Sequence, residues 1–124
     1  MQMRFALPCL AGLMGAAGVA LAARAAHAGN DASLMTAALF LLIHAAAVTG
    51  IAGLAPAGRA GRWILAAALV LALGTVLFSA DLAIRHFGGS RLFAMAAPAG
   101  GTLMILGWIA ICLASVPQLP GKQD

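Results

Sequence analysis

The chain has 124 residues, of which 64% are hydrophobic and 8% are charged, and its net charge is +4. A water-soluble domain carries about a quarter charged residues, because its surface faces water. Seven basic and three acidic side chains cannot cover a globule of this size, so an ordinary soluble domain is excluded. The composition indicates that lipid is the outer solvent.

Four long segments contain no Asp, Glu, Lys or Arg, and they are 5–23, 32–58, 63–80 and 92–121. A spanning helix needs roughly 20 apolar residues to cross the hydrocarbon of a bilayer. The segments are continuously apolar rather than alternating, which favours helices over a membrane barrel. The sequence therefore predicts an all-α, integral membrane four-helix bundle that forms a single membrane domain over 1–124. We expect its helices near 4–24, 34–55, 63–84 and 94–116.

The first apolar segment resembles a secretory signal, because Arg4 precedes it and residues 26–28 read Ala-His-Ala, a possible cleavage site. The apolar run is longer than a typical signal core, and Arg24 separates it from that site. We therefore predict that this segment is retained as the first helix.

The basic residues lie singly at the helix ends and in the loops, so the sequence predicts no nucleic-acid partner. In a bundle with four crossings, one end holds Arg4, Arg59, Arg62 and Lys122. The other end holds Arg24, Arg85 and Arg91 together with Asp31 and Asp81. The excess of positive charge at the first end favours both termini in the cytoplasm. Trp63, beside Arg62, fits an anchor at the membrane interface.

Small residues recur in the first helix at Gly12, Gly15 and Gly18. In lipid, helices associate by close backbone approach and dispersion, and small side chains permit that approach. These glycines pack either inside the bundle or against a partner protein or a second copy of the chain.

Pro98, Gly100 and Gly101 lie close together in the last apolar segment. Proline removes a backbone donor and clashes with the preceding turn, so we expect a kink or break near Pro98. The stretch 92–97 is then either a turn that dips into the membrane or the first part of the helix.

His44 lies near the middle of the second helix, where an ionisable side chain is costly and is a candidate for function. A structural hydrogen bond to a neighbouring helix is one interpretation, and a proton relay or a quinone contact is the other. His27 and His86 lie about 15 Å or more from it along the helix axis, so no histidine pair of this chain can hold a haem at the centre of the bilayer. We predict no cofactor.

Asp81 has two candidate partners. Arg24 is at a similar depth in the parallel first helix, and Arg85 is one turn further along the same helix. A metal set of His27, Asp31, Asp81 and His86 is conceivable at this end, but the spacing matches no metal motif, and we predict no metal. The sequence contains no nucleophile–base pair or phosphate loop and predicts no catalytic residue.

Several segments resemble the YgdD family, which comprises small bacterial inner-membrane proteins with eukaryotic transmembrane relatives. Residues 73–79, LGTVLFS, contain Gly74 and Ser79, and residues 98–101 read PAGG. Residues 106–108 read LGW, and weaker matches are His27 within AHA and His44. The matches run in order along nearly the whole chain.

The resemblance implies a four-helix inner-membrane protein whose first helix is retained. It implies no activity, because the family is functionally uncharacterised. It also implies that the fold uses His27, His44, Ser79, Pro98, Gly100 and Gly101. The chain departs from the family at Arg24, where an aromatic is expected, and at Asp81, where a small or hydroxyl residue is expected.

Three functions remain open at this point. The chain is expected to be a non-enzymatic accessory or assembly component that acts through helix packing, within a larger membrane complex or with a second copy. Alternatively, it is a subunit of a small transporter or channel, or a subunit of a redox complex that contacts quinone or haem through His44.

Overall fold

A computed structural model describes residues 2–116 of the chain. Over this range it contains four helices and no strand, and each helix is long and apolar enough to cross a membrane. The helices are α1 (Gln2–His27), α2 (Ala32–Leu54), α3 (Gly58–Gly88) and α4 (Ala96–Ser115). The predicted all-α membrane bundle is confirmed. Lys122 lies outside the described residues.

The third helix is longer at both ends than the predicted range 63–84. The prediction followed the uncharged run, whereas α3 also includes Arg59 and Arg62 in its first turns and Arg85 near its end. At 1.5 Å per residue its 31 residues extend about 46 Å, which exceeds the roughly 30 Å of hydrocarbon. Both ends of α3 therefore bring charged side chains to the membrane surfaces. Gly89 ends the helix with a φ of 68°, a left-handed conformation that glycine adopts readily.

The predicted kink or break near Pro98 falls at the start of a helix. Residues 89–95 are non-helical, α4 begins at Ala96, and its first backbone hydrogen bond runs from Ala99 N–H to the Met95 carbonyl. Pro98 lies in the first turn, where the backbone N–H groups have no partner within the helix. The proline therefore costs no hydrogen bond. For the stretch 92–97, the structure places residues 92–95 before the helix and Ala96 and Ala97 in its first turn.

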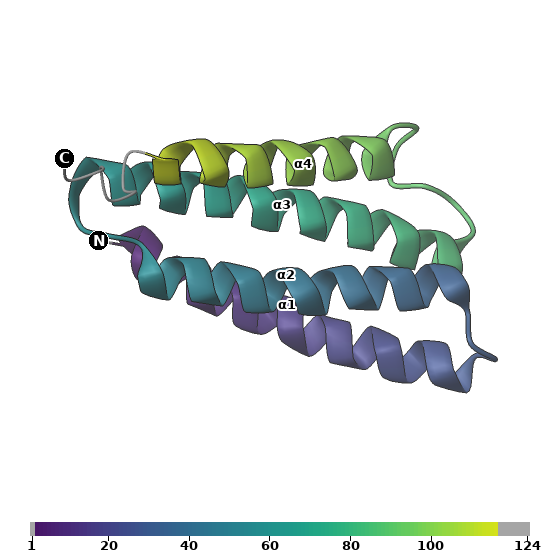
Figure 1. The fold of residues 1–124 in the computed structure, drawn as a ribbon. Helices are drawn as coiled ribbons and strands as arrows, with labels where there is room; N and C mark the ends of the chain where they lie inside the picture. The colour runs from purple at the N-terminus through teal and green to yellow at the C-terminus, as the bar shows by residue number, and fades with distance from the viewer. Residues whose placement is uncertain (1, 117–124) are drawn as a thin grey trace.

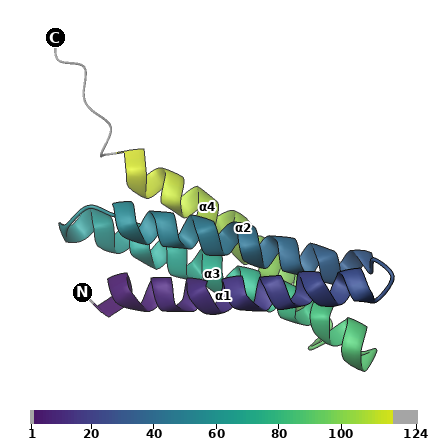
Figure 2. The same cartoon turned by 90° about the horizontal axis from the view of Figure 1, so that it is seen from below.

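The helices lie next to one another in the order of the sequence, as two hairpins stacked together (Figure 1). The most extensive contacts join α3 to α4 and α1 to α2, those between α2 and α3 are smaller, and those between α1 and α3 are slight. Figure 2 shows that α4 runs obliquely across the other helices. The outermost helices α1 and α4 thus expose much of their surface to the surrounding lipid.

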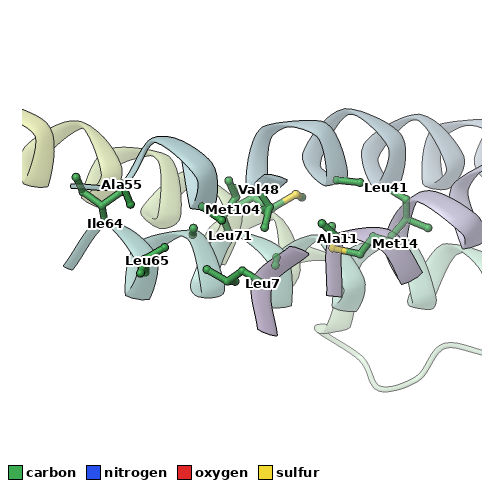
Figure 3. Packing of buried hydrophobic residues seen from close by; sticks show 14 residues of the cluster. Leu7, Ala11, Met14, Leu41, Val48, Ala55, Ile64, Leu65, Leu71 and Met104 are labelled. Carbon is green, nitrogen blue, oxygen red and sulfur yellow. The ribbon is translucent and has the colours of Figure 1, made fainter. Parts of the chain in front are cut away.

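The core lies where α1, α2 and α3 meet, and Met104 of α4 reaches into it (Figure 3). Leu7 and Met14 of α1 are each 2% exposed and pack in the same cluster as Val48 and Leu71. The first helix therefore contributes to the core, and cleavage after Ala28 would remove that part of it.

Glycines bring α3 and α4 into direct backbone contact. A Cβ atom added at Gly74 would lie 2.8 Å from the Gly100 carbonyl oxygen, and one added at Gly100 would lie 2.6 Å from the Phe78 nitrogen. A Cβ at Gly107 would lie 2.9 Å from the Leu71 Cα. Neighbouring Gly101 has open space instead. The predicted positions Gly74 and Gly100 therefore form this contact, and Gly101 does not take part in it.

The glycines of α1 divide between two faces. A Cβ at Gly18 would lie 2.8 Å from Leu42 and 3.1 Å from the Ala38 carbonyl oxygen, so this glycine packs tightly against α2. Gly15 also faces α2, at a looser distance, whereas Gly12 is exposed and has open space around it. Within the described chain, internal packing uses Gly18 and leaves Gly12 on the outer face.

Candidate functional site

His44 is 8% exposed, and each of its ring nitrogens faces a partner from the chain itself. Nδ1 lies 2.8 Å from the Phe40 carbonyl oxygen, one turn earlier in α2. Because a carbonyl only accepts, Nδ1 carries the proton and Nε2 is left as an acceptor. The indole Nε1–H of Trp108 donates to this Nε2 over 3.4 Å. The imidazole is thus held in one neutral tautomer.

Aromatic rings surround this histidine and connect three helices. The Phe40 ring stacks on the imidazole with centroids 5.6 Å apart, and it also contacts the Phe78 ring of α3 at 4.8 Å. The Trp108 ring of α4 lies 6.1 Å from the imidazole. His44 and Trp108 therefore link α2 to α4 through side chains. A metal or haem iron would need Nε2, which Trp108 occupies.

Ser79 is the buried polar side chain that lacks a partner within the described residues. It is 1% exposed and lies at an apolar groove of about 370 Å³ between α1 and α3. The other helical hydroxyls with hydrogen bonds donate to the carbonyl four residues earlier, as Thr75 does to Leu71 over 2.8 Å. The remaining cases are Thr36, Thr49, Thr102 and Ser115. A hydroxyl buried without a partner is costly, so Ser79 is a weak point in the packing.

Asp81 is fully buried and joins the end of α3 to the loop that follows it. Its Oδ2 accepts a 2.8 Å hydrogen bond from Arg85 Nε, and Arg85 Nη2 forms an ion pair with the same oxygen. Its Oδ1 accepts from the Leu92 backbone N–H at 2.9 Å. Of the two predicted partners, Arg85 is the one the structure pairs with Asp81. The Arg24 side chain is exposed and has no hydrogen bond to another described residue.

A second acidic contact lies at the same end of the bundle. Asp31 caps α2 by accepting from the Leu34 N–H at 2.8 Å, and its Oδ2 lies 3.1 Å from His86 Nδ1. The Leu34 hydrogen bond, helped by His86, holds the pKa of Asp31 below its ordinary value.

The conceivable metal set does not assemble. His27 instead directs its Nδ1 to the Ala23 carbonyl oxygen of its own helix, at 2.8 Å. Within 2–116, no three His, Cys, Asp or Glu side chains gather in a way that would hold a metal.

The candidate residues therefore occupy separate places rather than one site. His44 lies in the interior, Ser79 lies at the groove between α1 and α3, and Asp81 closes the end of α3. Sequence reasoning missed the pairing of His44 with Trp108, although Trp108 belongs to the LGW stretch. The available signal in the sequence was the indole N–H of Trp108 in an apolar helix, because such a donor needs a hydrogen-bond acceptor when it is buried.

Four helices able to span a bilayer, with polar side chains largely bonded inside the bundle, define a small multi-pass helical membrane protein. A profile of the family described as "Protein of unknown function (DUF423)" matches residues 10–101. Because this match covers most of the chain, the protein belongs to the DUF423 family.

The chain is also similar to the UPF0382 inner membrane protein YgdD of Escherichia coli (strain K12), with 31% identity over 103 residues. The match covers 83% of this chain and 78% of the relative, and the YgdD protein of Shigella flexneri matches to the same extent. The resemblance inferred from the motifs is thus confirmed, and the chain is an inner membrane protein of an uncharacterised family. No solved structure matches it.

Proposed function

We propose that the protein is a non-enzymatic accessory or assembly component that acts in the inner membrane through helix packing. The observation that carries this proposal is that the protein's own atoms engage the ionisable side chains buried in its interior. His44 is bonded through both nitrogens, and Asp81 through both oxygens. A catalytic or transport site would instead leave such groups open toward a ligand.

The outer face of α1 supports an accessory role. Gly12, Ala16 and Ala20 are exposed and follow one another at four-residue intervals, so they lie on one side of the helix. Such a stripe allows close approach of another helix in lipid. In this proposal the occupant is a helix of a larger membrane complex or α1 of a second copy.

The transporter and redox alternatives have less support. The transporter interpretation rested on a broken fourth helix and on His44, but Pro98 lies in the first turn of α4 and does not interrupt the helix. The redox reading needs His44 Nε2 for a quinone or haem contact, and Trp108 donates to that atom.

Isolation of the tagged chain in mild detergent, followed by mass spectrometry, tests the proposal. A partner recovered in fixed ratio supports an accessory role, and Gly12→Leu is expected to abolish its recovery. Gly50→Leu is the matched control, because Gly50 is also a helical glycine with open space, but on α2. A self-dimer with proton-coupled uptake in liposomes, or a haem spectrum in the purified protein, would overturn the proposal.

We further propose that both termini face the cytoplasm. Along the sequence, the basic residues that flank the helices on one side of the membrane are Arg4, Arg59, Arg62 and Lys122, against Arg24, Arg85 and Arg91 on the other. An excess of Lys and Arg favours the cytoplasmic side. In a variant without Cys9 and Cys112, a cysteine at Ser90 is expected to react with a membrane-impermeant maleimide in cells with a permeabilised outer membrane. A cysteine at Ala57 is expected to stay unlabelled, and the reverse pattern would refute this orientation.

A further inference from the structure

A long groove lies between the beginning of α3 and the end of α4. It has a volume of about 720 Å³ and is lined almost entirely by apolar atoms. Small side chains create the hollow, since Ala66 and Ala67 of α3 face Ala110 and Ala114 of α4 across it. The glycine contact between these helices lies further along α3, from Leu71 to Phe78. The groove is large enough to take a chain of apolar carbon atoms.

This groove ends at a cluster of positive charge. An adjoining hollow of about 300 Å³ is lined by Arg59, Arg62, Trp63 and Ala66, and all of these except Arg62 also line the groove. The two spaces therefore form one continuous surface, which is apolar along the helices and cationic at the membrane boundary. Trp63, which is 66% exposed, lies where they meet, as expected for an interfacial tryptophan.

The two arginines are not used by the fold. Arg4, at the same end of the bundle, donates from Nη2 to the Ala55 carbonyl oxygen at 2.7 Å. The side chains of Arg59 and Arg62 are exposed and have no hydrogen bond or ion pair with any residue in 2–116. Ala57, which precedes α3, also provides no side-chain cap, so the first backbone N–H groups of this helix have no side-chain acceptor. Both features favour a negatively charged group at this position.

We propose that this surface binds one anionic phospholipid, with the phosphate between Arg59 and Arg62 and an acyl chain in the alanine-lined groove. Basic pockets between spanning helices are a recurrent mode of anionic headgroup recognition, and guanidinium groups match phosphate oxygens geometrically. A soluble anion would leave the groove unfilled. A zwitterionic lipid would bring a cation toward the two arginines. The inference is independent of the accessory role.

Lipid retention in a defined mixture tests the site. The full chain is reconstituted into vesicles of equal phosphatidylglycerol and phosphatidylethanolamine, extracted in mild detergent and measured by native mass spectrometry. The wild type is expected to retain one phosphatidylglycerol per chain. The double variant Arg59→Gln/Arg62→Gln is expected to lower the ratio of retained phosphatidylglycerol to phosphatidylethanolamine about 30-fold, which corresponds to about 2 kcal/mol for the loss of two arginines near a charged surface.

Two further variants separate this site from general charge and from misfolding. Arg24→Gln/Arg91→Gln removes the same charge at the opposite end and is expected to leave retention unchanged. Ala114→Leu keeps both arginines but fills the groove, and it is expected to lower retention of either lipid while circular dichroism stays native. Retention of both lipids in the supplied ratio by the wild type, or an equal loss in the two double arginine variants, would overturn the proposal.

Discussion

Helix α3 contacts its neighbours α4 and α1 in two very different ways. Toward α4 its backbone lies against backbone, because Gly74, Gly100 and Gly107 have no side chains to hold the helices apart. Toward α1 the contact is slight, and an apolar groove of about 370 Å³ remains beside the unpartnered Ser79. Both residues of α3 concerned, Gly74 and Ser79, belong to the same LGTVLFS stretch.

One sequence motif thus serves two faces of α3 that have opposite packing requirements. Gly74 faces α4, where the absence of a side chain is needed because the nearest atoms include the Gly100 and Met104 backbone, which cannot move aside. Ser79 faces the loosely packed side, where its hydroxyl contributes no bond to a described residue. We therefore expect changes on the α4 side to be severe and changes on the α1 side to be mild.

The largest expected effect comes from filling the tight side. Gly74→Val places a branched side chain against the Gly100 carbonyl and the Met104 nitrogen, and it should destabilise the bundle by about 3 kcal/mol or more. Thermal unfolding in detergent measures this, with Gly50→Val as the control at an open helical position. A native unfolding temperature for Gly74→Val would show that α3 and α4 do not touch as described.

The next effect concerns the end of α3. Asp81→Asn removes the charge that pairs with Arg85, and it also weakens the hydrogen bond to the Leu92 N–H, so the unfolding temperature should fall by several degrees. A double-mutant cycle should give coupling between positions 81 and 85 and none between 81 and 24. Coupling of Asp81 to Arg24 alone would contradict the observed pairing.

A smaller effect is expected between α2 and α4, where side chains make the link. In a cycle of His44→Leu and Trp108→Phe, the coupling should be about 0.6 kcal/mol and at most about 1.7 kcal/mol, as for other hydrogen bonds in membrane bundles. Unfolding with increasing concentrations of a denaturing detergent measures the free energy of unfolding of each variant. Additive effects of the two substitutions would show that the 3.4 Å hydrogen bond contributes nothing.

The smallest effect is expected on the loosely packed side. Ser79→Ala removes a buried hydroxyl without a partner and should be neutral or slightly stabilising. Thr75→Val, one turn earlier, removes a hydroxyl that is bonded to the Leu71 carbonyl and should cost about 1 kcal/mol. Equal destabilisation by both would indicate that Ser79 has a partner in the membrane.

The sequence was sufficient for the fold because uncharged runs report directly where lipid surrounds the chain. The predicted bounds were less accurate for α3, because this helix continues beyond the hydrocarbon at both ends and includes Arg59 and Arg85. The sequence could not predict both hydrogen-bond partners of His44. Phe40 lies one turn earlier in the same helix, whereas Trp108 lies on another helix, 64 residues later. Whether Gly100 or Gly101 faces α3 depends on the rotation of α4 about its own axis, which no local sequence pattern determines.

The backbone contact between α3 and α4 is tested most directly by comparing the unfolding temperatures of Gly100→Ala and Gly101→Ala in the same detergent. The two substitutions are identical in chemistry and differ only in what the new methyl group meets, which is the Phe78 backbone at position 100 and open space at position 101. We predict a clear fall in unfolding temperature for Gly100→Ala, and no change or a slight rise for Gly101→Ala because alanine favours helix. Equal effects, or the reverse order, would contradict the backbone contact between α3 and α4.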